Sequence, residues 1–421
     1  MRSASAPRTA VAARLRHPAL ALVLGQLTTA VTAFVMNLLS SNVLAPEDRG
    51  FLAFFLQLAY VTTVLGLLGV ERPYAASRTT ATFASAYRDL TALTRTAWVC
   101  MGALVLLAGV LALRGSWPLA ALALGSAVYM RANTAIRKVR IAYIASRSTG
   151  PFVSTLLGTQ LALLASGTAL FLLDVDSSAA WLDAYAATGL AAPLIARRWS
   201  TREPLGRDAS PVDLSRVRRE GLRLLPASFG NTALLKSDRL LLPFLSTPAE
   251  LGRYVAVATI MEVGTWPIQQ WVDASLGRWR ATGARGPRRR MVMWALVGAV
   301  AVTAGLCAVT FVVIEHWLPA EYRSAQRLLL PLAVGAVLYA GTRIQQGLMI
   351  ARGLPGAVSV AEVSGLGVSL LLYVVLMPRH GAMGAAVGSA LGYLALLLVA
   401  SVIQRRHART HDAEGADDGT A

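Results

Sequence analysis

Long apolar runs alternate with short polar segments along almost the whole chain of 421 residues. A helix that crosses a bilayer needs about 20 mostly apolar residues, and the pattern holds twelve segments of that kind. The predicted spans cover approximately residues 19–44, 51–71, 97–113, 117–136, 151–173, 178–196, 222–246, 252–274, 291–314, 326–350, 355–376 and 382–403. The pattern therefore predicts an all-α integral membrane protein with about twelve transmembrane helices.

Composition agrees with this interpretation. The chain is 55% hydrophobic and 15% charged, with a mean hydropathy of +0.54, which is too apolar for a soluble protein of this length. A net charge of +18 would suggest a nucleic-acid partner in a soluble protein. Here the charge follows the order of the spans, so we expect membrane lipids and no nucleic acid as partners.

Basic residues gather in every second connection between the predicted spans. They precede the first span and follow the second, fourth, sixth and eighth, whereas the intervening loops carry one or two cations at most. By the positive-inside rule, these basic segments and both termini are cytoplasmic. We expect a multi-pass protein of the cytoplasmic (inner) membrane, with Arg202 and Arg285 inside and Glu250 outside.

The longest basic connection contains Pro204, Gly206 and Pro211 and divides the spans six and six. The expected parts are an N-terminal six-helix bundle over residues 1–196, a cytoplasmic linker over 197–219, a C-terminal six-helix bundle over 220–403 and a disordered cytoplasmic tail over 404–421.

A short repeat supports duplication of one half. The segments LAPEDRGF and STPAELGRY both contain Pro-x-x-x-Gly, at Pro46/Gly50 and Pro248/Gly252, in the first hairpin of each half. Two six-helix halves of the same topology are related by a pseudo-two-fold axis along the membrane normal. In transporters of this plan the substrate site lies at the midplane between the halves.

The stretch LLKSDRLLLPFL, residues 234–245, places Lys236, Asp238 and Arg239 in an apolar run. A charge at the bilayer centre costs about 2.5–3.5 kcal/mol, so such residues usually face a partner or a hydrated cavity. Lys236 and Arg239 share a helical stripe with Ser228 and Thr232, and Asp238 lies off it. We expect the two cations to face a cavity and Asp238 to be a structural partner that orients Arg239.

Polar residues recur in other predicted spans, including an uncharged stripe in the first. Structural pairing between helices is the alternative explanation, but interhelical polar contacts average only about 0.6 kcal/mol, which is little for so many charges. The candidate substrate-binding residues are Arg239, Lys236, Arg343, Glu262, Gln269, Gln26 and Asn37. No metal-ligand spacing, nucleotide-binding motif or catalytic triad is visible, so we expect no metal, no cofactor and no catalytic residue.

The run GLRLLPASFGNTALLKSDRLLLPFLSTPAELGRYVAVATIMEV, residues 221–263, resembles the seventh and eighth helices of bacterial polysaccharide flippases. These belong to the multidrug/oligosaccharidyl-lipid/polysaccharide (MOP) exporter superfamily. The shared features are the Asp238/Arg239 pair followed by leucines, the turn that ends at Tyr254, and Glu262 one helix later. Some relatives have fourteen spans, whereas only twelve fit here.

This resemblance implies a MATE-like pair of six-helix bundles that exports a lipid-linked oligosaccharide by alternating access, for the synthesis of cell-surface polysaccharide. It implies that Lys236, Arg239 and Arg343 neutralise the phosphates of a polyprenyl carrier and that Gln269 contacts sugar. Glycan-assembly enzymes are further expected partners. One alternative is a cation-coupled multidrug antiporter, which should show an acid inside the N-terminal half. The other is a membrane glycosyltransferase or polymerase, which should have larger outer loops.

Overall fold

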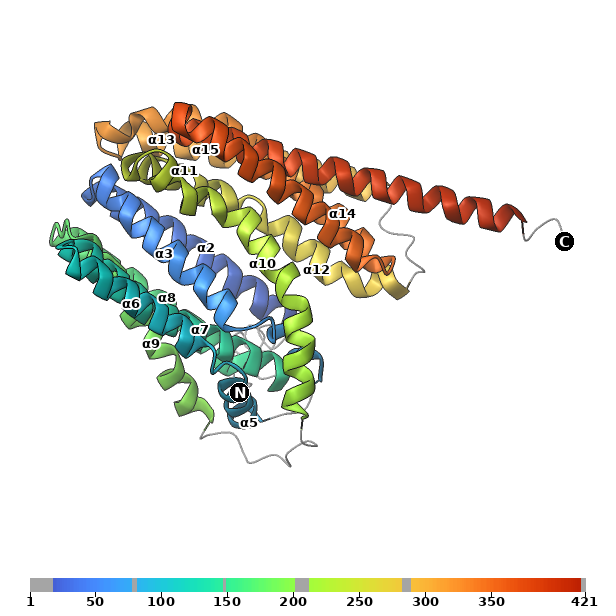
Figure 1. Ribbon diagram of the computed structural model, residues 1–421, viewed down its shortest axis with the longest axis horizontal. Helices are drawn as coiled ribbons and strands as arrows, with labels where there is room; N and C mark the ends of the chain where they lie inside the picture. The colour runs from blue at the N-terminus through green and yellow to red at the C-terminus, as the bar shows by residue number, and fades with distance from the viewer. Residues whose placement is uncertain (1–17, 78–81, 147–148, 201–211, 282–288, 418–421) are drawn as a thin grey trace, which may run out of the picture. The chain divides into compact units, whose positions relative to one another are not determined.

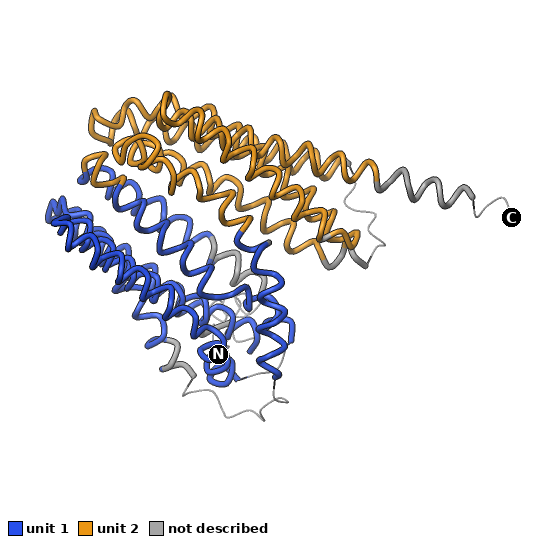
Figure 2. Tube along the Cα trace, in the orientation of Figure 1, with its two compact units in different colours: residues 1–44, 51–229 blue, residues 45–50, 230–421 orange. Residues whose placement is uncertain are grey.

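The computed structural model describes residues 18–77, 82–146, 149–200, 212–281 and 289–417, and nearly all of them are helical (Figure 1). These segments contain no β-strand. The chain forms two compact units, which Figure 2 shows in different colours: residues 1–44 with 51–229, and residues 45–50 with 230–421. The expectation of an all-α chain is confirmed.

The first unit is built from long helices packed around α7. Its helices are α2 (Pro18–Val43), α3 (Pro46–Gly66) from its second turn onward, α4 (Glu71–Ser77), α5 (Phe83–Leu93), α6 (Ala97–Leu113), α7 (Trp117–Ser146), α8 (Thr149–Leu172), α9 (Ser178–Ser200) and the start of α10 (Leu214–Leu245). Helix α7 packs on both α6 and α9, and α8 packs on α2 and α9. Trp181 and Met36 are fully buried in the core of this unit.

The second unit is centred on α14. Its elements are the remainder of α10, α11 (Pro248–Val263), α12 (Trp266–Ala281), α13 (Arg289–His316), the 3-10 helix η1 (Ala320–Leu328), α14 (Leu329–Ala351) and α15 (Pro355–Asp417). Helix α14 packs on α12, α13 and α15. The approach of α12 is close, because a side chain at Gly347 of α14 would collide with Val272 and Trp279.

Helix α10 passes from one unit to the other. It begins after Asp213, whose carboxylate accepts hydrogen bonds from the hydroxyl (2.6 Å) and the backbone N–H (2.9 Å) of Ser215. These bonds cap the helix and lower the pKa of the Asp213 carboxyl. The helix belongs to the first unit as far as Phe229 and to the second from Gly230. Pro226 lies one turn before that point, where a proline removes a backbone hydrogen bond.

Two predicted spans differ from the observed helices. The eighth, expected as one helix over residues 252–274, is broken at residues 264–265 into α11 and α12. The eleventh and twelfth form α15, which turns back at Gly381, where φ is 54°. The two arms of this hairpin are close, because a side chain at Gly392 would collide with Ser369 of the facing arm.

Helix α15 continues through residues 404–417, where the sequence predicts a disordered tail. The run from Gln404 to Ala413 contains no proline and no glycine, so nothing in it interrupts a helix that has already formed. Arg202 and Arg285, which are expected to be cytoplasmic, lie outside the described residues.

Six helices of the described segments are long and apolar enough to cross a membrane, or seven if the bent pair α5–α6 forms one span. Twelve spans are predicted, and three features of the helices explain part of the difference. Helix α10 carries many charges, the break divides α11 from α12, and α15 counts once although it contains a hairpin. The helices are those of a multi-pass membrane protein.

The two Pro-x-x-x-Gly segments pack against each other within the second unit. A side chain at Gly50 would collide with the backbone carbonyl of Pro248, and a side chain at Gly252 would collide with that of Pro46. Each glycine therefore allows the approach of the other copy of the repeat. This reciprocal contact gives the two copies equivalent surroundings, as a duplication predicts.

Candidate functional site

The charges of LLKSDRLLLPFL meet the end of α11 inside the second unit. The ammonium nitrogen of Lys236 lies 2.9 and 3.0 Å from the two carboxylate oxygens of Glu262. Nη2 of Arg239 lies 3.0 Å from Oε1 of the same carboxylate. Lys236 and Arg239 are three residues apart on α10, which directs both toward one neighbour. Together with Asp238 and Tyr254, these residues are called the charge cluster below.

The charge cluster is buried, but its central carboxylate can be reached. The Arg239 side chain is 3% exposed and that of Lys236 is 15% exposed, whereas the Glu262 side chain is 31% exposed. Two cations thus share one carboxylate that borders open space. An incoming ligand would meet Glu262 before it meets Arg239.

Asp238 makes contacts other than the one expected. Its carboxylate accepts hydrogen bonds from the hydroxyl of Tyr254 and from the backbone N–H of Arg239, the latter at 2.8 Å. The guanidinium of Arg239 pairs instead with Glu262. Successive residues on a helix point in different directions, so the side chains of positions 238 and 239 do not face each other. In this structure Glu262 is the residue that orients Arg239.

The buried Arg239 and the half-buried Arg343 both retain an unused donor. The Nε atoms of Arg239 and Arg343 have no hydrogen-bond partner among the described residues. A buried donor without an acceptor costs about 1–3 kcal/mol, and buried polar groups are usually satisfied by protein, water or a bound ion. These two donors are exceptions to that rule in this structure.

Arg343 belongs to a second polar group, formed by α12, α14 and α15. Its Nη1 donates to Oε1 of Gln346 (3.0 Å), and Nε2 of Gln346 donates to Oε1 of Glu362 (3.2 Å). Its Nη2 lies 3.8 Å from a carboxylate oxygen of Asp273, whose side chain is 57% exposed. This series runs from an exposed acid to the buried Glu362. We call these four residues the polar ladder.

Gln269 is linked to the end of α11 by hydrogen bonds through Thr265. Its Nε2 donates to the hydroxyl of Thr265 (3.0 Å), and that hydroxyl donates to the backbone carbonyl of Glu262 (2.8 Å). Because α12 begins at Trp266, Gln269 lies in the first turn of α12.

The other two candidate residues, Gln26 and Asn37, lie on α2 in the first unit. Asn37 is buried, with 4% of its surface exposed. The side chain of Gln26 lies outside the described residues. The candidate residues therefore come from both units, and the charged ones come from the second.

The sequence pattern did not reveal a cationic group that the structure places in the first unit. Nη1 of Arg137 lies 3.4 Å from Oε1 of Glu71, and its guanidinium lies 4.9 Å from the centre of the Tyr60 ring. The prediction ended the fourth span at residue 136, but α7 continues beyond it. The spacing of four between Asn133 and Arg137 was a signal that the polar face continued.

Metal binding has no support in the described part of the chain. Among the described residues, no three His, Cys, Asp or Glu side chains lie together in a way that could hold a metal ion. The chemistry available at the site is that of cations, carboxylates, amides and phenols.

Neither a protein-family model nor a curated protein matches this sequence. Solved structures do match the fold. A structure described as lipid II flippase MurJ in an inward closed conformation has a TM-score of 0.63 at 10% identity, covering 91% of this chain and 87% of that one. An inward-facing MATE-family multidrug resistance transporter of the MOP superfamily has a TM-score of 0.62 at 12% identity, covering 90% and 94%.

A third structure, the MATE multidrug transporter DinF-BH, has a TM-score of 0.57 at 14% identity, covering 93% of this chain and 95% of that one. These similarities extend over nearly the whole chain and confirm the expected MATE-like membrane fold. At such low identity they establish the fold alone.

Proposed function

We propose that this chain is a flippase that moves a lipid-linked oligosaccharide, on a polyprenyl-phosphate-type carrier, across the cytoplasmic membrane by alternating access. The observation that carries the proposal is the arrangement of Lys236 and Arg239 around one carboxylate. The buried Arg239 and the half-buried Lys236 share Glu262, and Nε of Arg239 has no hydrogen-bond partner among the described residues. This arrangement suits a ligand with anionic oxygens.

Phosphate is the anionic group that fits these donors best. A guanidinium presents its donors as a planar fork that matches two phosphate oxygens, and an ammonium adds a point charge beside it. A phosphate bound there competes with Glu262 for Lys236 and Arg239. Binding of a phosphate therefore weakens the ion pairs with Glu262. Because these ion pairs join α10 to α11, the bound head group affects the contact between the two helices.

The membrane helices and the fold support a transporter, and the basic connections support cytoplasmic termini. Under this proposal Arg343 joins Lys236 and Arg239 in neutralising the phosphates, Gln269 contacts the sugar portion, and the polyprenyl tail stays in lipid. Surface polysaccharide synthesis is the process served, and glycan-assembly enzymes are its partners.

A cation-coupled multidrug antiporter is the second candidate, because MATE transporters match the fold about as well as MurJ does. Such a protein needs an acid that is available to a cation. Glu262 is already occupied by Lys236 and Arg239, so the charge cluster favours an anionic ligand.

Transport in cells or liposomes tests the proposal. Arg239→Ala should abolish movement of the lipid-linked oligosaccharide while the protein still inserts at a near-normal level, and Arg239→Lys should recover only part because the planar fork is lost. Arg323→Ala is the control, since Arg323 is exposed on η1. Deletion of the gene should leave the lipid-linked unit inside the cell.

Two results would contradict this function. Full transport by Arg239→Ala combined with Glu262→Gln would mean that Arg239 serves only to neutralise Glu262. An intact surface glycan together with lost drug resistance in the deletion strain would identify the antiporter.

A further inference from the structure

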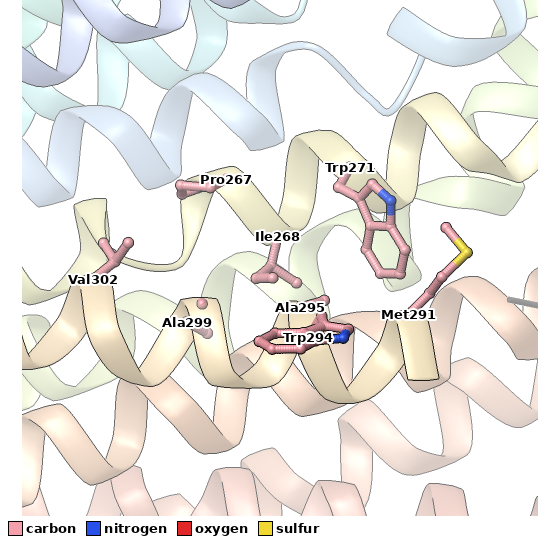
Figure 3. Close-up of a pocket in the computed structure, with 10 residues that line it drawn as sticks. Pro267, Ile268, Trp271, Met291, Trp294, Ala295, Ala299 and Val302 are labelled. Carbon is pink, nitrogen blue, oxygen red and sulfur yellow. The ribbon is translucent and has the colours of Figure 1, made fainter. Parts of the chain in front are cut away.

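A cavity of about 490 Å³ lies between α12 and α13 in the second unit (Figure 3). Trp271 of α12 and Trp294 of α13 are on either side of it, and Pro267, Ile268 and Val302 line its other end. None of the residues that line the cavity carries an ionisable side chain. The cavity is therefore suited to an apolar ligand.

The cavity lies along an exposed, apolar face of α13, which is the kind of face that bilayer hydrocarbon covers. Helix α13 is apolar enough to cross a membrane, and only 22% of its apolar window is buried inside the protein. Two of the lining residues, Met291 and Trp294, are 51% and 64% exposed. The lining positions on α13 extend from Met291 to Val302, about 16 Å at 1.5 Å per residue. That is about half of a 30 Å hydrocarbon core, the depth of one leaflet.

Packing around α12 explains why the cavity is not filled by protein. One side of α12 fits closely against α14, where Val272 and Trp279 occupy the space beside Gly347. The side toward α13 presents Pro267 and Trp271 to the small residues Ala295 and Gly298. A flexible hydrocarbon chain would complete the packing on this second side.

A positive charge stands at one end of the cavity. Arg290 precedes the lining residue Met291 and is four residues from Trp294 and eight from Gly298, so it lies on the same face of α13. Arg290 is exposed, and no carboxylate of the described residues forms an ion pair with it. Tryptophan and arginine near the end of a membrane helix, as Trp294 and Arg290 are in α13, are typical of the membrane interface. Basic side chains at the interface attract anionic head groups.

We propose that this groove is a binding site for an anionic glycerophospholipid, with one acyl chain between Trp271 and Trp294 and the phosphate at Arg290. A glycerophospholipid is favoured over the polyprenyl carrier by the position of the charge. Its phosphate lies at the interface, as Arg290 does, whereas the carrier's phosphate would be inside, at the charge cluster. The lipid would support α12 next to the break that follows Glu262.

Native mass spectrometry of the purified full chain tests the site. The protein would be incubated with phosphatidylglycerol, phosphatidylcholine or polyprenyl phosphate in mild detergent. Gly298→Leu fills the groove, because a side chain at Gly298 meets nothing within 4 Å. Gly305→Leu is the matched control: it is a glycine of the same helix, equally open, and outside the groove. Arg290→Gln removes the charge alone.

We expect the unaltered chain to retain phosphatidylglycerol about fivefold better than phosphatidylcholine, the preference that one interfacial cation supports. Gly298→Leu should lose bound lipid by at least about the same factor, since it fills the space for the chain. Gly305→Leu should retain it. Arg290→Gln should still bind lipid but lose the preference for the anionic one.

Three outcomes would overturn the proposal. Equal lipid retention by Gly298→Leu and Gly305→Leu would show that the groove is not the site. Equal binding of the two glycerophospholipids by the unaltered chain would remove the role of Arg290. Displacement of phosphatidylglycerol by an equal concentration of polyprenyl phosphate would identify the carrier as the occupant. Transport is not measured, so the result is independent of the proposed flippase activity.

Discussion

Glu262 is the residue on which the charge cluster depends, because it holds Lys236 and Arg239 together. Glu262→Gln should leave two cations uncompensated and lower the free energy of unfolding by about 1–3 kcal/mol. This is less than the loss for a fully buried pair, since 31% of the Glu262 side chain is exposed. Thermal unfolding in detergent measures the change.

The matching control is Glu321→Gln, at an exposed acid of η1. Glu262→Gln combined with Lys236→Met should recover only part of the stability, because Arg239, whose side chain is 3% exposed, still lacks its carboxylate. Unchanged unfolding of Glu262→Gln alone would mean that the ion pairs do not stabilise the protein.

Residue patterns predicted which side chains carry charge inside the helices, but not their pairing. Lys236, Arg239 and Glu262 were all recognised as candidates from their place in apolar runs. Asp238 was assigned to Arg239 because the two are adjacent in sequence, whereas the contact that forms joins α10 to α11. Such a contact depends on how two helices rotate against each other, and one sequence does not contain that information. Arg137 was missed because the predicted span ended at residue 136, whereas α7 continues to Ser146.

At the level of elements, the hairpin of α15 depends on Gly381. Its φ of 54° is unfavourable for residues with a side chain, and a Cβ there would lie 2.6 Å from a carboxylate oxygen of Glu250. That carboxylate accepts hydrogen bonds from Arg253 (2.8 Å) and from the backbone N–H of Ala382 (2.9 Å). The turn is therefore held by α11 as well as by its own backbone.

Gly381→Ala should lower the free energy of unfolding by about 1–2 kcal/mol from backbone strain alone. Gly367→Ala, in the same helix at a position with open space around it, should lose nothing. The two variants are compared by thermal unfolding in detergent. Equal stability would show that the hairpin relaxes freely around Gly381.

Most helices could be placed from apolar runs because a bilayer-spanning helix has a fixed length. The break between α11 and α12 could not, since Gly264 and Pro267 stand inside a stretch long enough for one span. A proline in the first turn of a helix is compatible with either a new start or a kink. The contacts around Glu262 decide between a new helix and a kink, and these are tertiary contacts that the sequence does not reveal.

At the level of the whole molecule, the duplicated Pro-x-x-x-Gly segment was the best sequence evidence for the architecture. Its two copies pack reciprocally through Gly50 and Gly252. The fold matches both a lipid flippase and multidrug transporters with similar scores. The substrate therefore has to be argued from the charge cluster, because a flippase and multidrug transporters share this fold.

The passage of α10 between the units has a mechanical consequence. A helix whose two ends belong to different units is stiff unless it contains a position where it can bend. Pro226 and Gly230 supply one, since the proline removes a backbone hydrogen bond and the glycine adds no side-chain bulk. If the chain works by the proposed alternating access, the bending stiffness of α10 at this point limits the transport rate.

Pro226→Ala combined with Gly230→Ala should stiffen α10 and slow transport about threefold to tenfold, which is about 1 kcal/mol in the barrier. Binding of polyprenyl phosphate should be unchanged, because Lys236 and Arg239 are untouched. Gly102→Ala on α6, also in open space, is the control. An unchanged transport rate in the double variant would mean that α10 moves as a rigid rod and that the angle changes elsewhere.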